Sequence, residues 1–163
     1  MEFVKAHGTG NDFVVVEDLT DRYRITPQLA RAVCDRHLGV GADGLIRIAP
    51  GGETPFFMDY RNADGSLAEM CGNGVRVVGK YLGDRGLVGP TFDLETRAGI
   101  KHLKLHADDR GGIDRVTVDM GPPTLDDERT LEIDGEQVIA TCLSMGNPHA
   151  VVFVDDVDKA AVT

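Results

Sequence analysis

The chain has no tryptophan, only three cysteines, and aromatic residues make up just 6% of its 163 positions. So few cysteines, in an odd number, argue against a disulfide-stabilised secreted domain and indicate reduced thiols in a cytoplasmic protein. Long apolar runs are also missing: none approaches the ~18 residues that span a membrane, and Met1 leads directly into strand-like sequence without a signal peptide.

Positive charge is scarce as well. The 17 Lys and Arg residues face 27 Asp and Glu residues, which gives a formal net charge of −10. This balance argues against nucleic acid or an anionic membrane as a partner. What remains is ordinary for a globular protein: 42% of the residues are hydrophobic, 27% are charged and 20 are glycine. The length allows one domain, or one domain and part of another.

The apolar pattern predicts an α/β (α+β) protein with many strands and few helices. One helix is expected at 27–37, with Thr26 as its N-cap and Pro27 at its first position. A second is expected from Cys71 to Leu82, buried on most of its circumference. Strands are expected at 3–7, 13–18, 45–49, 55–61, 91–97, 100–107, 116–120, 131–133, 137–145 and 149–154.

A domain boundary is predicted near position 120. Gly121-Pro122-Pro123, followed by the acidic stretch 126–128, separates an expected first domain at 1–120 from a second at 121–163. The segment 146–152 echoes 10–16, which suggests an internal duplication. The sequence ends in what looks like the start of a helix, so we expect the second domain to be cut short.

Cys71 is the most informative residue. It opens Cys71-Gly72-Asn73-Gly74, although Gly72, Gly74 and Gly79 each weaken the expected helix by up to about 1 kcal/mol relative to alanine. Such glycines make sense if backbone N–H groups must approach an anion and the sulfur. Because a helix N-terminus favours thiolate over thiol, we expect a lowered pKa for Cys71. Cys34 and Cys142 lie in apolar segments and are expected to be packed and inert.

Two chemistries suit such a thiolate. Acyl transfer needs a histidine to activate the cysteine, with His149 as the candidate and His7 as an alternative. Abstraction of a carbon-bound proton needs groups that hold a zwitterionic amino acid. Four asparagines at turns or element ends are suited to this role, namely Asn11, Asn62, Asn73 and Asn147. The plain alternative is that asparagines simply favour turns.

Other motifs carry little functional weight. Gly8-Thr9-Gly10 resembles a phosphate loop, but a strand rather than a helix is expected after it. His102 and His106 share one face of an expected strand with Lys104, whose charge would oppose a metal cation. We therefore expect a solvated face there and no metal site. No lysine has a local context that suggests a Schiff-base cofactor.

Four segments resemble diaminopimelate epimerases, in the order found in that family and across nearly the whole chain. They are Gly8-Thr9-Gly10-Asn11-Asp12-Phe13, Arg61-Asn62-Ala63-Asp64-Gly65-Ser66, Glu69-Met70-Cys71-Gly72-Asn73-Gly74-Val75-Arg76 and Gly146-Asn147-Pro148-His149. The Cys-Gly-Asn-Gly segment is highly specific. Related proline racemases and phenazine-type isomerases carry a histidine after the glycine, so Asn73 argues against them.

The resemblance implies a cofactor-independent isomerase that interconverts LL- and meso-2,6-diaminopimelate in lysine and peptidoglycan precursor synthesis. It implies two pseudo-symmetric domains, each with antiparallel or mixed strands around a central helix. One cysteine from each domain would face the substrate α-carbon, one as thiolate base and one as thiol acid. Mapped onto this sequence, Cys71 is one of them. Gly72 and Asn73 would bind the α-carboxylate, while Asn11, Asn62 and Asn147 would hold the substrate and His149 would support the reacting centre.

The chain departs from the family in its second half. The second catalytic cysteine, its glycine motif and an expected Glu-Arg pair are absent, so the chain alone is predicted to be inactive. Uncovered apolar surface favours self-association, and a homodimer is one outcome. Two alternatives stay open: another cysteine-dependent isomerase of the same fold, and a non-catalytic binding module in which the Cys71 loop is merely a turn.

Overall fold

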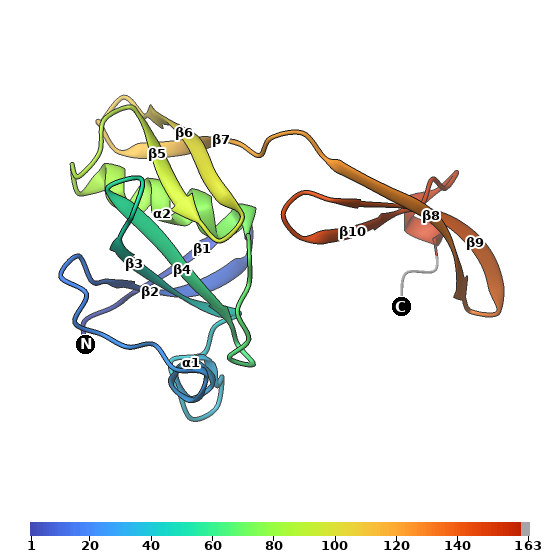
Figure 1. The fold of residues 1–163 in the computed structure, drawn as a ribbon, viewed down its shortest axis with the longest axis horizontal. Coiled ribbons are helices and arrows are strands. Elements are labelled where there is room, and N and C mark those ends of the chain that lie inside the picture. Colours follow the sequence, from blue (N-terminus) through green and yellow to red (C-terminus); the bar gives the residue numbers. More distant parts are fainter. Residues whose placement is uncertain (161–163) are drawn as a thin grey trace. The chain divides into compact units, whose positions relative to one another are not determined.

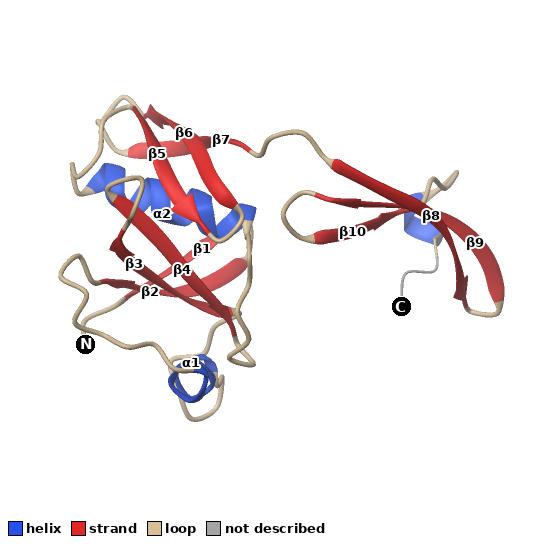
Figure 2. Ribbon diagram, in the orientation of Figure 1, coloured by secondary structure: helices blue, strands red, loops and turns tan. Residues whose placement is uncertain are grey.

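The computed structural model describes residues 1–160 and separates the chain into two compact units, one from Met1 to Met120 and one beginning at Gly121 (Figure 1). The elements of the first unit are, in chain order, β1 (Val4–Gly8), β2 (Asn11–Glu17), α1 (Pro27–Cys34), β3 (Gly44–Pro50), β4 (Phe56–Asn62), α2 (Gly72–Asp84), β5 (Thr91–Thr96), β6 (Gly99–Ala107) and β7 (Ile113–Asp119). Strands dominate this unit, as Figure 2 shows.

The seven strands of the first unit form one mixed sheet in chain order, from β1 to β7. The pairs β2–β3 and β4–β5 are parallel and the other four are antiparallel. Helix α2 contacts β1 and β2 at one end of this order and β6 and β7 at the other. The sheet therefore curls around α2, which confirms the predicted fold of mixed strands around a central helix (Figure 1).

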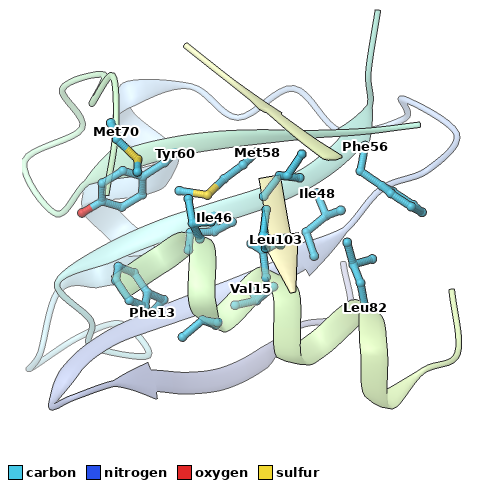
Figure 3. Packing of buried hydrophobic residues seen from close by; sticks show 14 residues of the cluster. Phe13, Val15, Ile46, Ile48, Phe56, Met58, Tyr60, Met70, Leu82 and Leu103 are labelled. Atoms are coloured by element: carbon cyan, nitrogen blue, oxygen red, sulfur yellow. The ribbon is translucent and has the colours of Figure 1, made fainter. Parts of the chain in front are cut away.

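Strand β2 has both faces buried, which explains its continuous apolar run. Phe13 and Val15 join the main core around α2, whereas Val14 and Val16 pack in a smaller cluster with Cys34 of α1. Figure 3 shows the main core, where strand side chains converge on the helix. Its labelled members are Phe13, Val15, Ile46, Ile48, Phe56, Met58, Tyr60, Met70, Leu82 and Leu103.

Close packing accounts for two glycines of α2. A Cβ atom on Gly79 would lie 2.9 Å from Leu103 Cδ2, and one on Gly83 would lie 2.6 Å from Leu105 Cδ1. Alanine at either position would push the helix away from β6. From the sequence, the α2 glycines were expected to allow backbone contacts with an anion and the sulfur. For Gly79 that interpretation is wrong, because its absent side chain makes room for the core.

The second unit is a three-stranded antiparallel meander. Strands β8 (Thr124–Ile133), β9 (Glu136–Ser144) and β10 (Pro148–Val151) pair in the order β10–β9–β8, and a 3-10 turn, η1 (Val157–Lys159), follows. Asp134 and Gly135 have φ angles of 52° and 81°, so the predicted Asp-Gly hairpin turn is present.

Most element predictions agree with the structure, and two differ. Helix α1 ends at Cys34 instead of position 37, because the Asp35 side chain accepts hydrogen bonds from the backbone of the next residues and forms a turn. The strand expected at 131–133 is longer, because β8 begins at Thr124 and includes the acidic stretch 126–128, with a bulge between Leu125 and Glu128. The helix start expected at the chain end falls partly on residues 161–163, outside the described residues. No helix among residues 1–160 is long and apolar enough to cross a membrane.

Candidate active site

The strand order brings three predicted site segments to one end of the sheet. Asn11 begins β2, and the parallel β3 begins beside it at Gly44. Asn62 ends the antiparallel β4 and is paired with Gly44. The N-terminus of α2 lies at this same end, because the Cys71 side chain contacts Asn11. Residues 60 positions apart in the sequence thus meet around one sulfur.

Cys71 is the N-cap residue of α2. Its backbone is extended, with φ −143° and ψ 105°, and its Sγ accepts a hydrogen bond from the Gly74 N–H at 3.4 Å. The first helical hydrogen bond runs from the Val75 N–H to the Cys71 carbonyl at 2.9 Å. The Asn73 and Gly74 N–H groups, which precede this bond, donate toward the sulfur, and a negative charge is favoured at this end of the helix.

Burial affects the pKa of Cys71 more than these N–H donors do. Burial raises the pKa of the Cys71 thiol, while the backbone N–H groups of Gly74 and Asn73 and the charge of Arg76 lower it by less, so the net direction is upward. The predicted lowering of this pKa is therefore wrong. The physical reason is that removing water from a sulfur penalises the thiolate more than the two backbone donors and the Arg76 charge favour it. This direction favours the thiol form of Cys71 at neutral pH.

Asn73 is fixed by contacts with the first hairpin. Its Oδ1 accepts a hydrogen bond from Thr9 Oγ1 at 3.2 Å and another from the Arg76 guanidinium. The approach is close: a Cβ atom on Gly8 would lie 2.9 Å from the Asn73 carbonyl oxygen. Gly8 is therefore needed for the hairpin to reach the helix end. This anchoring leaves the Asn73 main chain in the first turn of α2, beside Gly72.

Asn62 has a different local role. Its Nδ2 donates to Ser66 Oγ at 3.0 Å, and its backbone N–H donates to the Ser66 carbonyl at 3.0 Å. Ser66 is held in turn by Asp64 Oδ1, at 2.8 Å from its N–H. The side-chain amide of Asn62 is thus engaged in its own turn and makes no hydrogen bond to Cys71.

Asn147 and His149 belong to the second unit. His149 Nδ1 lies 2.9 Å from the Asn147 carbonyl oxygen, and both residues are exposed. Gly146 before them has a φ of 88°, the same value as Gly10 before Asn11. Each glycine lies in the turn of an antiparallel hairpin, which supports the proposed internal duplication. His7, the other histidine considered for acyl transfer, faces its own turn: the Gly10 N–H lies 3.4 Å from its Nδ1.

Three side chains that shape this site were not predicted from the sequence. Thr9 and Arg76 hold Asn73, and Asp43 accepts a hydrogen bond from Asn11 Nδ2 at 2.8 Å. Arg76 follows Asn73 by three residues, so the helical spacing could have revealed it. Asp43 lies in a glycine-rich loop, and only the strand order shows that it reaches Asn11. Among residues 1–160 no three His, Cys, Asp or Glu side chains are arranged to hold a metal ion.

Comparison with known proteins decides the family. The sequence profile described as Diaminopimelate epimerase matches residues 3–125. Diaminopimelate epimerases of Corynebacterium glutamicum and Acetivibrio thermocellus are 42% and 45% identical to the chain over 98% and 97% of its length. The chain belongs to the diaminopimelate epimerase family. It spans 61% of the length of each of these two relatives.

Two solved structures share the fold of this chain. A hydroxyproline epimerase from Agrobacterium vitis aligns with 99% of the chain and 53% of its own length, with a TM-score of 0.74 and 16% identity. A phenazine biosynthesis protein of the PhzF family from Bacillus anthracis aligns with 97% of the chain and 58% of its own length, with a TM-score of 0.65 and 19% identity. At these identities the likeness shows the fold alone.

Proposed function

We propose that this chain supplies one half of the active site of an enzyme that interconverts LL- and meso-2,6-diaminopimelate. The observation that carries the proposal is the Cys71 sulfur at the N-cap of α2, with the Gly74 N–H at 3.4 Å, in a member of the diaminopimelate epimerase family. Lysine and peptidoglycan precursor synthesis is the matching physiological role.

The proposed reaction is a proton exchange at the α-carbon. In one direction a thiolate at Cys71 takes the α-proton and becomes a thiol, and the electron pair of the C–H bond passes into the α-carboxylate as an enolate-like carbanion. A thiol on the opposite face then gives a proton to the α-carbon and becomes a thiolate. In the other direction Cys71 is the acid. The exchange needs no cofactor, because both protons are carried by sulfur.

Backbone N–H groups stabilise the carbanion in this proposal. Gly72 and Asn73 lie in the first turn of α2, where N–H groups precede the helical hydrogen-bond ladder. A carboxylate placed there meets fixed donors and the positive end of the helix dipole. Thr9 and Arg76 keep the Asn73 side chain out of this space by binding its Oδ1.

The other site residues hold and orient the substrate in this proposal. Asn11, Asn62 and Asn147 contact the zwitterionic amino acid, and His149 supports the reacting centre. Asn62 keeps its hydrogen bond to Ser66 in this proposal, and its amide oxygen and second N–H hydrogen are offered to the substrate. Asn11 already lies against the Cys71 sulfur within the first unit.

The second thiol of the proposed pair is not provided by the chain's other cysteines. Cys34 is the last residue of α1 and is buried, with 3% of its surface exposed. Cys142 lies in the middle of β9 and is paired with Ala150. Neither follows the glycine-rich pattern of Cys71. We therefore infer that the 163-residue chain alone does not epimerise diaminopimelate.

The alternatives differ in substrate. The fold is shared with a hydroxyproline epimerase and a PhzF-family protein, so another cysteine-dependent isomerase of this fold is the second candidate. Asn73, which anchors the first hairpin through Thr9, favours the diaminopimelate epimerase. A non-catalytic module predicts instead that Cys71 is unaffected by any amino acid.

Substrate protection tests the proposal. The native gene product is treated with iodoacetamide, and alkylation of Cys71 is followed by peptide mass spectrometry with and without diaminopimelate. We expect diaminopimelate to slow Cys71 alkylation, with trans-4-hydroxyproline having no effect and Cys142 serving as the internal control. Protection by hydroxyproline alone would support the racemase alternative. Equal rates under all conditions would support the binding module.

A further inference from the structure

The Asn11 amide lies between a carboxylate and the Cys71 sulfur. Its Nδ2 donates to Asp43 Oδ2 at 2.8 Å, and its Oδ1 lies 3.7 Å from Cys71 Sγ. An asparagine amide has one donor end and one acceptor end, and a half-turn of the amide exchanges them. The end that faces the sulfur is therefore decided by the partner on the other side.

Asp43 can only accept hydrogen bonds. The hydrogen bond from Asn11 and then the Asp12 N–H hold the pKa of Asp43 below its usual range, so it is ionised at neutral pH. An ionised carboxylate has no proton to give. Asn11 must turn its NH₂ group toward Asp43, and its oxygen is left for the Cys71 thiol.

The Asp43 carboxylate is itself held in place. Its Oδ1 accepts from Arg36 at 2.7 Å, and its Oδ2 accepts from the Asp12 N–H at 3.1 Å. Arg36 also binds the Asp12 side chain at 2.7 Å, and Lys5 Nζ lies 2.7 Å from Asp12 Oδ2. Two cations and two carboxylates thus fix the geometry behind Asn11.

We propose that Asp43 is a positioning residue that acts through the Asn11 amide: it presents a hydrogen-bond acceptor to Cys71 and keeps the resting sulfur protonated. The proposal rests on the function given above, in which Cys71 serves as the acid in one direction. Asp43 thereby adds to the effect of burial in favouring the thiol form of Cys71 before substrate binds.

The other groups that act on Cys71 are Arg76 and Tyr60. Arg76 on α2 favours the thiolate through its charge. Tyr60 on β4 stays neutral, because burial and then the neighbouring Cys71 raise its pKa well above the usual range. Neither residue contacts Asp43 by a hydrogen bond, so changing Asp43 leaves both in place.

The test is the pH profile of Cys71 alkylation in the 163-residue chain. In Asp43→Asn the charged Arg36 guanidinium is a stronger donor than the neutral Asp12 N–H, so Arg36 takes the oxygen of the new amide and the NH₂ group faces Asn11. The Asn11 amide turns and offers its donor end to the sulfur. Replacing an acceptor by a donor lowers the thiol pKa by about one unit, so the thiolate fraction at pH 7 rises about tenfold, which the pH profile of alkylation reports.

A double-mutant cycle separates this effect from the loss of a charge. Asn11→Ala alone removes the acceptor without adding a donor, and we expect a rise of about two- to threefold. In that background, Asp43→Asn should change the rate by less than about twofold. A tenfold effect of Asp43→Asn that persists without Asn11 would overturn the proposal, as would an unchanged rate in the single variant.

Folding is checked in the same samples. Cys34 is buried, so its alkylation stays slow in every variant that retains the native fold. The measurement uses no amino-acid substrate. An unchanged alkylation rate in Asp43→Asn would therefore exclude Asp43 as a positioning residue. The proposed epimerase function would still be tested separately by substrate protection.

Discussion

Substitution of Gly79 by alanine tests whether core packing explains the glycines of α2. The added methyl would lie 2.9 Å from Leu103 Cδ2 and 3.0 Å from Val116 Cγ1, and Leu103 is only 2% exposed. In a helix interior, alanine raises the unfolding free energy by about 1 kcal/mol relative to glycine. Inserting a methyl into a packed core costs about 1–3 kcal/mol. The expected net result is a loss of about 1 kcal/mol of unfolding free energy, measured by urea denaturation.

Two further variants make this prediction discriminating. Gly72→Ala is the matched control, because its methyl would lie 3.7 Å from Met120 Cε, an ordinary contact. It should change stability by less than about 0.5 kcal/mol. Leu103→Val removes the group that the Gly79 methyl meets, so the double variant should be more stable than the sum of the single effects by about 0.5–1 kcal/mol. A stabilisation of about 1 kcal/mol by Gly79→Ala alone would refute the packing argument.

Three other changes have defined outcomes. Asp18→Asn should lower the unfolding free energy by about 3 kcal/mol, because it removes the buried carboxylate that lies 2.9 Å from Arg47. Asp21→Asn, on the exposed side of the same arginine, should lower it by less than about 0.5 kcal/mol. Burial opposes the charge of Asp18, but two backbone N–H groups and Arg47 outweigh it and lower the pKa of this carboxyl. The stabilisation of the folded state by Asp18 is therefore present above about pH 4 and is lost as the pH falls through the folded-state pKa. Acid denaturation would reveal this loss. Thr9→Gly relieves the strain of a φ of 51° but also removes the hydrogen bond from Thr9 to Asn73, so the unfolding free energy should change by less than about 1 kcal/mol; a loss above about 2 kcal/mol would contradict the strain argument. Wild-type Cys71 alkylation should rise with pH through a midpoint above the ordinary pKa of a cysteine, and a midpoint below that ordinary value would contradict the burial effect.

Local sequence signals predicted the elements well. Thr26 caps α1 through a hydrogen bond from the Leu29 N–H at 3.2 Å, as its place before Pro27 indicated. Leu103 is buried while Lys104 is exposed, in agreement with the alternation expected for that strand. Such features depend on neighbours within a few residues, which a single sequence displays directly.

Effects that depend on distant residues could not be predicted. The upward pKa direction of Cys71 comes from burial by the surrounding core, which its glycine context does not reveal. The contact between Asn11 and Asp43 depends on the parallel pairing of β2 with β3. Likewise, the sequence shows only that Gly79 weakens a helix, whereas the structure shows that Leu103 leaves no room for a larger residue there.

The most direct test of the central claim is deuterium incorporation at the α-carbon of diaminopimelate in heavy water. The full native gene product is compared with its Cys71→Ala variant and with a Cys34→Ala control. We predict exchange by the unaltered protein and the control, and a loss of at least about 10³-fold in Cys71→Ala, since no other group of this half-site carries the proton. Exchange that continues undiminished in Cys71→Ala would contradict the account.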